Sequence, residues 1–277
     1  MRLHVFRSMA GLVSGLLWTA TAVAQTPSPF NYWQNASGIV LAPLAGPIPD
    51  WRVTAGMGAA VIPLYEGSSH YKIVPAPAFD VRYKDIAFLS SGDGIGVNLI
   101  RGATYRAGVA VGYDLGRNAH LSGRLNGLGN IDAAPEVRAF ADIAFLPFVV
   151  NLDLRRALGG HDGVIGDVGV YLPVYGSKAL VVFVGPSVTA ANKRYMQAYF
   201  GVSTAQSAGS SAHFAPYTAS GGLKNFGFGV SAIYHLTDRW FVDSDVSYER
   251  LLDSAGGSPI VQDRSQLGVS VVLGYEF

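Results

Sequence analysis

The sequence predicts an all-β fold: a transmembrane antiparallel up-and-down β-barrel of an outer membrane, with about 12 strands. Only 14% of its 277 residues are charged, against about 25% in an average soluble domain. Apolar residues alternate with polar or small ones along most of the chain, which is the period of a strand with two different faces. Beyond the N-terminal segment, no uncharged apolar run is long enough for a membrane-spanning helix. We therefore expect the hydrophobic residues in strands that face lipid.

Residues 1–24 have the pattern of a secretory signal peptide. A short basic region precedes the apolar run Met9–Trp18, and Ala22-Val23-Ala24 provides a cleavage site. This run is shorter than the about 20 residues of a spanning helix, which favours a signal peptide over a membrane anchor. We expect three parts: the signal peptide, a periplasmic segment over 25–50 rich in Pro and Ala, and the outer-membrane barrel over 51–277.

Alternating apolar residues place the strands. At the C-terminus, every second residue from Leu267 to Leu273 is apolar. The same pattern predicts strands near 51–62, 71–83, 86–91, 94–100, 104–115, 135–145, 148–158, 164–173, 179–189, 217–235, 239–250 and 264–277. An even number of strands is expected when both termini are periplasmic. The count includes a small hairpin at 91–94; without it the number is odd, unless 217–235 is two strands meeting at Gly222-Leu223.

Aromatic residues on the apolar face favour a membrane barrel over a secreted β-sandwich, which also shows a period of two. Tyr105 and Tyr113, like Trp240 and Tyr248, lie eight residues apart on that face. Eight residues of tilted strand span roughly 20 Å, close to the apolar band of about 25 Å that aromatic girdles flank in outer-membrane barrels. The other face is expected to line the lumen with charged residues: Arg106, Asp114, Arg138, Asp142, Asp153, Asp243, Asp245 and Glu249.

Two lengths of connection predict the orientation of the barrel. Short periplasmic turns are expected near 83–85, 146–147, 175–177 and 236–238. Longer outer loops are expected at 116–134, 190–216 and 251–263. Within the second of these loops, residues 195–202 are the best candidate for a short helix. Its aromatic residues either pack as a lid over the lumen or form a surface for a partner.

Composition and spacing argue against several function classes. The chain has no Cys, which excludes a disulfide framework, a thiolate metal site and a cysteine nucleophile. Its formal net charge of +1 gives no basic footprint for nucleic acid. The six His are dispersed without metal-ligand spacing. His120 and Ser122 are spaced like a base and a nucleophile, but they lie in a Gly- and Asn-rich predicted loop without an orienting acid, which favours a solvated loop.

Five short blocks in loops and at strand ends carry a further signal. They lie within 63–68, 116–129, 195–202, 258–260 and 274–277. Their main residues are Tyr65, Gly67, Ser68, Arg117, Leu125, Gly127, Gly129, Tyr195, Tyr199, Phe200, Gly201, Ser258, Pro259, Tyr275 and Phe277. Together, and in this order across essentially the whole mature chain, they resemble the MipA/OmpV family of outer-membrane proteins. One departure is Ala208, inserted between Ser207 and Gly209 where relatives commonly have Ser-Gly.

The resemblance implies a non-enzymatic protein of the outer membrane of a Gram-negative bacterium, without a cofactor. The eponymous member of the family is a scaffold that links a lytic transglycosylase of the MltA class to a bifunctional penicillin-binding protein, coupling murein hydrolysis to synthesis. The other implied partners are membrane lipid and the barrel-assembly machinery, which would read the last strand through Tyr275 and Phe277. Other relatives are associated with adhesion and with osmotic or antibiotic responses.

Two function classes remain open at this point. The first is a scaffold or interaction protein, and the second is a small-solute channel or an adhesin-like outer-membrane protein. The charged lumen favours a channel, but water-filled porins usually have about 16–18 strands. Single-channel conductance distinguishes the two classes.

Overall fold

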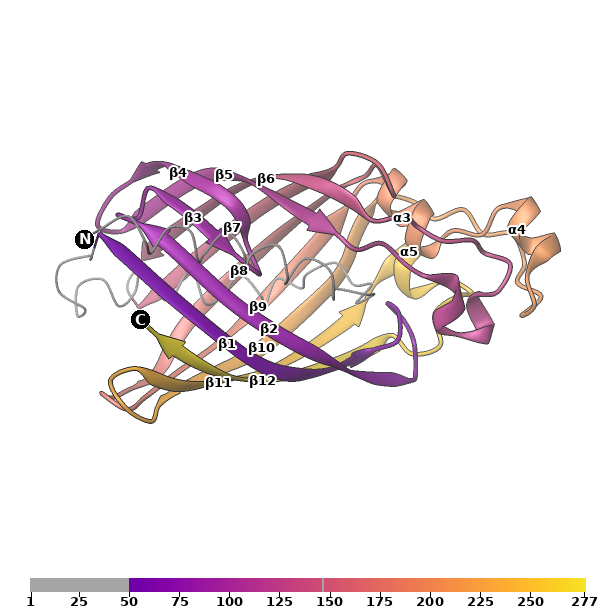
Figure 1. Ribbon diagram of the computed structural model, residues 1–277. Coiled ribbons are helices and arrows are strands. Elements are labelled where there is room, and N and C mark those ends of the chain that lie inside the picture. Colours follow the sequence, from indigo (N-terminus) through magenta and orange to yellow (C-terminus); the bar gives the residue numbers. More distant parts are fainter. Residues whose placement is uncertain (1–49, 146) are drawn as a thin grey trace, which may run out of the picture.

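The barrel closes with twelve antiparallel strands. The computed structural model describes residues 50–145 and 147–277; within these ranges each strand pairs with its neighbours in sequence, and β1 and β12 complete the ring (Figure 1). The predicted fold class is therefore confirmed, including the small hairpin on which the strand count depended. The signal peptide expected at 1–24, and all but the last residue of the segment expected at 25–50, lie outside the described residues.

The strands of the barrel agree closely with the predicted ranges. They are β1 (Trp51–Pro63), β2 (Tyr71–Tyr83), β3 (Ala87–Ser90), β4 (Gly94–Arg101), β5 (Tyr105–Asp114), β6 (Ala134–Phe145), β7 (Phe148–Ala157), β8 (Val164–Gly176), β9 (Leu180–Ala191), β10 (Gly222–His235), β11 (Trp240–Leu251) and β12 (Ser265–Glu276). The register at the closure pairs Thr54 of β1 with Glu276 of β12, so the chain enters and leaves the barrel at the same end.

Two predicted boundaries were wrong. Strand β10 begins at Gly222, not at 217, because Tyr217 exchanges both of its backbone hydrogen bonds with Val202 outside the barrel, each at 2.8 Å. Strand β8 continues to Gly176, beyond the expected 173, with a register shift between Pro173 and Tyr175 where it pairs with β9. In both cases the local pairing overrides the simple alternation of apolar residues.

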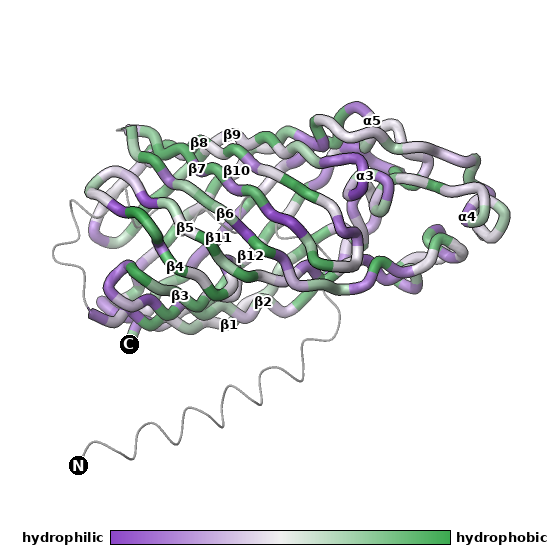
Figure 2. The backbone as a smooth tube through the Cα atoms, turned by 90° about the horizontal axis from the view of Figure 1, so that it is seen from above, coloured by the Kyte–Doolittle hydropathy of each residue, from purple (hydrophilic) through white to green (hydrophobic). Residues whose placement is uncertain are grey.

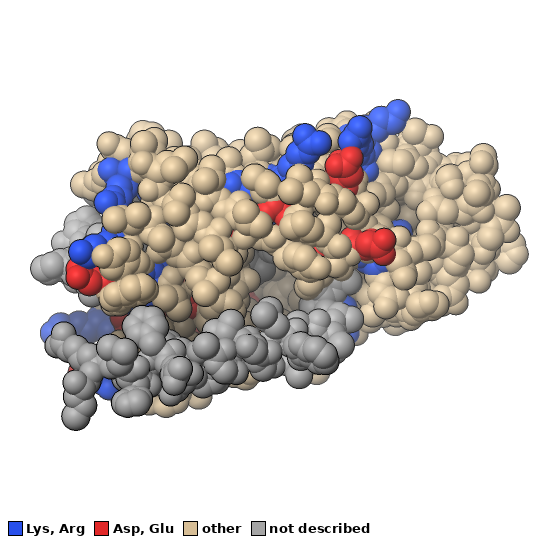
Figure 3. Space-filling view, turned by 45° about the horizontal axis from the view of Figure 1, so that its top comes forward, with Lys and Arg blue, Asp and Glu red and all other residues tan. Residues whose placement is uncertain are grey.

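Side chains of the wall alternate between two environments. On β11, Trp240 and Val246 are 44% and 43% exposed on the outer face, whereas Asp243 and Asp245 are buried on the inner face. Figure 2 shows the same alternation as hydrophobic and hydrophilic residues in turn, and the face of the barrel seen in Figure 3 is mostly uncharged. Of the eight charged residues predicted for the lumen, seven are buried and Glu249 is partly buried. An apolar outside and a polar inside are what a membrane barrel requires.

The long connections fold over the end of the barrel opposite the termini (Figure 1). They contain the short helices η2 (Ala119–Leu121), η3 (Gly123–Leu125), α3 (Lys193–Phe200), α4 (Thr204–Gly209) and α5 (Asp253–Gly256). Among the described residues, no helix combines the length and the hydropathy needed to cross a membrane. We call these connections the lid, defined as residues 64–70, 115–133, 158–163, 192–221 and 252–264.

Candidate functional site

Four of the five family blocks come together in the lid. One of its apolar clusters contains Tyr65, Ala119, Leu125, Leu128, Val202, Phe214 and Ile260. The Tyr65 hydroxyl oxygen lies 3.3 Å from the carbonyl oxygen of Ile260 and 3.0 Å from Gln262 Oε1, both of them acceptors. Blocks almost 200 positions apart in the sequence therefore share one core, which also places Gly67, Ser68, Gly129 and Gly201 in the lid.

Helix α3 carries the aromatic block into a second cluster. Asn192 caps the helix, because its Oδ1 accepts a hydrogen bond from the Tyr195 N–H at 3.1 Å. Tyr195 and Phe200 are fully buried and Tyr199 is 5% exposed. They pack against Ile165, Ala191, Met196, Ala219, Leu251 and Ala255. These aromatic rings therefore form the inside of a packed lid rather than an exposed surface for a partner.

Buried polar contacts connect α3 to the neighbouring blocks. The Tyr199 hydroxyl donates to Asp114 Oδ1 at 2.9 Å, and Arg117 Nη1 donates to the Tyr199 carbonyl oxygen at 2.7 Å. The Ser258 hydroxyl donates to the Phe200 carbonyl oxygen at 2.6 Å. Each contact satisfies a buried polar group that would otherwise destabilise the lid.

Polar residues of the loop after β5 make structural contacts. Ser122 Oγ accepts a hydrogen bond from the Arg124 N–H at 3.3 Å and caps η3, while His120 is exposed. In the described part of the chain, no hydrogen bond is seen between His120 and Ser122. Arg124, which the sequence pattern did not single out, donates from Nη2 to the Pro259 carbonyl oxygen at 2.7 Å, and its guanidinium lies 4.7 Å from the Phe214 ring centre.

Glycine permits a close contact between two lid segments. Gly127 has φ +89°, and a Cβ at this position would lie 1.9 Å from the Gly209 carbonyl oxygen. Ala208, the departure from the family pattern, lies in α4 beside this contact. Helix α4 was not predicted, although Ser203 and Gln206 form a reciprocal capping box whose sequence signal, Ser-x-x-Gln, is visible in the chain.

His161 forms a buried charged group that the sequence pattern did not reveal. Its Nε2 lies 3.6 Å from Asp114 Oδ2 and 3.7 Å from Glu136 Oε1. Burial opposes the charged imidazolium, but the two carboxylates outweigh it and raise the pKa of His161 to about 9. The group connects the turn between β7 and β8 to strands β5 and β6.

The imidazole of His161 and the carboxylates of Asp114 and Glu136 are also ligand types that zinc prefers, and zinc would need a free lone pair on the imidazole nitrogen that faces the carboxylates. The Gly163 N–H donates to His161 Nδ1 at 3.0 Å, which places the hydrogen of the neutral ring on Nε2. The imidazolium carries hydrogens on both ring nitrogens, so charging the ring gives up the hydrogen bond from Gly163 and keeps a hydrogen on Nε2. In this arrangement Nε2 has no lone pair to offer, and we interpret the group as an ion-paired contact that fastens the lid.

Ion pairs fill the lumen below the lid. We call Arg82, Asp93, Arg138, Asp153, Arg155 and Asp167 the luminal ladder, because each residue pairs with the next across the inner wall. Arg82 Nη2 lies 3.2 Å from Asp93 Oδ2, and Arg155 Nε lies 3.0 Å from Asp153 Oδ1. Nearby, Arg106 Nε lies 2.7 Å from Asp142 Oδ2.

Little space remains among these charges. The cavity bounded by Arg82, Asp93, Arg106, Arg138 and Asp142 has a volume of about 10 Å³, near the smallest volume of ~10–15 Å³ that holds a water molecule. Luminal acids on β11 also have polar neighbours. The Ser270 hydroxyl donates to Asp245 Oδ2 at 3.0 Å, and Asn225 Nδ2 donates to Glu249 Oε2 at 2.6 Å.

The last block forms an aromatic cluster at the end of the barrel that carries the termini. Tyr275 packs edge-on against Trp240 and against Phe277, with ring centres 4.9 Å apart in both pairs. Arg239 Nη1 donates to the Tyr275 hydroxyl at 3.0 Å. Phe277 is 74% exposed on the outside, a position suited to an aromatic girdle.

A closed antiparallel barrel with an apolar outer wall, a charged inner wall and a lid of long connections defines the class of outer-membrane-type β-barrels. The chain belongs to the MipA family: the family's sequence model, described as MltA-interacting protein MipA, matches residues 55–277. No curated protein matches the sequence.

Several solved structures have a similar barrel at low sequence identity. The NanC porin is 8% identical, with a TM-score of 0.42 over 81% of this chain and 98% of that one. A FadL homologue from Pseudomonas aeruginosa is 11% identical, with a TM-score of 0.42 over 92% and 95% of the two chains. The translocator domain of the autotransporter NalP from Neisseria meningitidis is 12% identical, with a TM-score of 0.37 over 98% of both chains.

Proposed function

We propose that the chain is a non-enzymatic scaffold in the outer membrane of a Gram-negative bacterium. It binds a lytic transglycosylase and brings murein hydrolysis together with synthesis by a bifunctional penicillin-binding protein. The family match over residues 55–277 carries this proposal, because the family is described by its interaction with MltA. The barrel-assembly machinery and membrane lipid are its further partners in this proposal.

The filled lumen supports a scaffold rather than a passive channel. The luminal ladder crosses the inner wall with buried ion pairs, and the lid packs over one end. A steady solute flux would require these charges to separate in a low-dielectric interior, which is costly. Single-channel recording in a planar bilayer tests this point: we expect silence, and steady conductance would favour the channel.

The end of the barrel that carries the termini provides the binding surface in this proposal. Its short connections and the adjoining strand end of β4 expose the cationic residues Lys84, Arg101, Lys178 and Arg239. A stable interface buries about 1,600 Å² in total, more area than such short turns present on their own. The segment 25–50 therefore supplies the rest of the surface in this proposal.

Charge reversal at the two ends of the barrel tests this surface. We expect the pair Arg101→Glu and Lys178→Glu to lower recovery of a lytic transglycosylase with the affinity-tagged protein from cross-linked cells. The matched control is the pair Lys193→Glu and Arg194→Glu, which changes the same charge on the lid. Both double variants should reach the outer membrane at parent levels, since exposed charges contribute about 0–1 kcal/mol to stability. Equal recovery with both would reject this surface, and no recovery with the parent would reject the scaffold function.

A further inference from the structure

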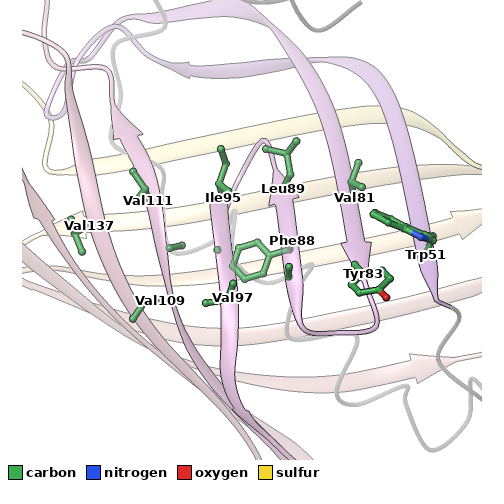
Figure 4. A pocket seen from close by; sticks show the side chains of 13 residues that line it. Trp51, Val81, Tyr83, Phe88, Leu89, Ile95, Val97, Val109, Val111 and Val137 are labelled. Atoms are coloured by element: carbon green, nitrogen blue, oxygen red, sulfur yellow. The ribbon is translucent and has the colours of Figure 1, made fainter. Parts of the chain in front are cut away.

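The barrel wall has a gap between β2 and β5. Strand β3 has only four residues, and β2 pairs with it only from Asp80 to Tyr83. Strand β4 pairs with β5 only as far as Val111. Among the described residues, no strand pairs with 71–78 of β2 on the side away from β1, and none pairs with 112–114 of β5 on the side away from β6. Figure 4 shows the β3–β4 hairpin turning back while β2 continues past it.

Two prolines prevent another strand from closing this gap. Phe79 directs its backbone towards the hairpin: its N–H donates to Ser91 Oγ at 3.3 Å, and its carbonyl accepts from the Ser91 N–H at 3.0 Å. Backbone groups of alternate residues in a strand face the same neighbour. The nitrogens of Pro77 and Pro75 therefore face the gap and have no hydrogen to donate. Proline on a free edge is a known way to block strand addition.

The edge of β2 consequently presents acceptors with few donors. The carbonyl groups of Ile73, Pro75 and Pro77 all face the gap by the same alternation. Free backbone groups at a sheet edge are not tolerated in contact with hydrocarbon, so these oxygens require a donor such as a hydroxyl group or water. A partner strand would bring its own carbonyls, which the prolines cannot satisfy.

The surroundings of the gap combine an apolar outer rim with small inner residues. Ile73 and Val111 are 77% and 54% exposed on the outer rim. On the inner face lie Ala76, Ala78 and Gly112, and a Cβ added to Gly112 would meet no atom within 4 Å. The gap therefore joins the lipid-facing surface to the inside of the wall through small side chains.

A depression in the outer wall leads to this gap. It has a volume of about 680 Å³ and is lined by Leu89, Ile95, Val97, Val109, Val111 and neighbouring apolar residues (Figure 4). Binding sites for small molecules usually have volumes of about 300–1,000 Å³. The depression runs across neighbouring strands, from Trp51 and Tyr83 near the end that carries the termini to Val137 of β6, and its lining is mostly apolar.

Lys72 adds a positive charge beside the gap. It lies on the inner face of β2, four residues before Ala76, and its Nζ has no hydrogen-bond partner among the described residues. A buried ammonium group without a partner is unfavourable, and an anionic ligand group would compensate it. Tyr71 and Tyr113, exposed on the outer face near the lid ends of β2 and β5, are aromatic residues of the kind that form the girdle where lipid head groups lie.

We propose that the gap between β2 and β5 is a lateral binding site for an anionic membrane lipid with hydroxyl groups in its head. The acyl chain lies in the depression of the outer wall. The head-group hydroxyls donate to the free carbonyls of β2, and the phosphate pairs with Lys72. This site is independent of the scaffold function, because it lies in the wall and not at the end that carries the termini.

Fluorescence quenching by brominated lipids tests the site in the purified full-length protein. The reporter is Gly112→Trp in a variant whose other tryptophans are Phe, reconstituted into vesicles with either brominated phosphatidylglycerol or brominated phosphatidylcholine. Phosphatidylglycerol has a phosphate and two hydroxyl groups, whereas the choline head has no donor. We expect strong quenching at 112 by phosphatidylglycerol and weaker quenching by phosphatidylcholine.

Matched variants define the outcomes. Ser187→Trp, on the inner face of the continuous wall, should not be quenched, and Val246→Trp, on the outer face, should be quenched by both lipids. Lys72→Gln should weaken phosphatidylglycerol binding about tenfold, equivalent to ~1.4 kcal/mol, while Lys72→Arg should retain it. Absence of quenching at 112 when 246 is quenched would show that the gap is closed to lipid. If both lipids quenched the tryptophan at 112 equally, and Lys72→Gln did not change this quenching, the assignment of an anionic head group to the site would be overturned.

Discussion

Asp93, at the tip of the β3–β4 hairpin, is held by Arg138 of β6, with 2.7 Å between Asp93 Oδ1 and Arg138 Nη1. The same guanidinium also pairs with Asp153 of β7, and Asp93 pairs in turn with Arg82 of β2. The shortest hairpin of the barrel, which has little backbone pairing of its own, is thus fastened from the lumen. The gap in the wall begins directly beyond the tip of this hairpin.

Asp93→Asn tests how far the hairpin depends on this contact. Breaking a buried ion pair by removing one partner typically costs about 3–5 kcal/mol, so we expect the hairpin to open more often. Hydrogen exchange of the protein in detergent should be faster over residues 87–97 than in the parent. Asp50→Asn is the control, because Asp50 pairs with Lys84 at the surface. An unchanged exchange rate in Asp93→Asn would mean that the backbone alone holds the hairpin.

The barrel wall could be predicted from the sequence because each strand carries its own local pattern of alternating apolar and polar residues. Alternation at positions such as Val137 and Arg138 shows which side chain faces lipid and which faces the lumen, whatever the neighbouring strands are. The partners of those side chains depend on register across strands. Asp93 and Arg138 are 45 residues apart, and no local pattern indicates that they meet. The gap had a visible signal, since two prolines at alternate positions of one strand indicate an unpaired edge.

The lid was less predictable than the wall. Its aromatic block was expected to be helical, but the position of Tyr199 against Asp114 depends on how three connections fold together. His161 was only one of several dispersed histidines in the sequence, and only the fold brings it to Asp114 and Glu136. Irregular connections have no periodicity from which burial can be inferred, so the lid core could not be derived from the sequence pattern.

Gly127→Ala should disturb the lid without unfolding the barrel. The new Cβ would overlap the Gly209 backbone carbonyl at 1.9 Å, which cannot rotate away as a side chain can. Gly129→Ala is the matched control, since Gly129 also has a positive φ, of +75°, but no atom lies within 4 Å of the added Cβ. Both variants bear a backbone cost of roughly 1–2 kcal/mol. Limited proteolysis over 203–212 should be faster in Gly127→Ala, and equal rates would contradict the close packing of α4.

His161 should make the stability of the lid depend on pH. Its pKa is about 9 in the folded protein and 6.5 for the free side chain, so the charged ring binds its proton more tightly when folded. The stabilisation from Asp114 and Glu136 is fully present below pH 6.5 and is lost as pH rises through 9. We expect the Tm of the purified protein to fall over this range, and to fall less in His161→Gln. His120→Gln, at an exposed histidine, is the control. If the Tm of His161→Gln fell with pH as much as the Tm of the parent, the pH dependence would come from another group.

Phe277 should matter for assembly more than for stability. Its ring packs edge-on against Tyr275, and its N–H donates to the Val53 carbonyl oxygen at 3.0 Å. Deleting it removes these contacts and about 2 kcal/mol of apolar burial at most, whereas the register of β12 with β1 and β11 is unaffected.

We expect the barrel-assembly machinery to bind the exposed edge of the last strand. Loss of the terminal aromatic residue of that strand should therefore slow binding of the chain to the machinery. We expect the deletion variant to accumulate in the periplasm and be degraded in cells, while the purified variant refolds into lipid at nearly the parent rate. The contrast between the two measurements is the test, because a stability defect would lower both. Equal outer-membrane levels of variant and parent, at expression high enough to load the machinery, would show that Phe277 serves only as a girdle residue.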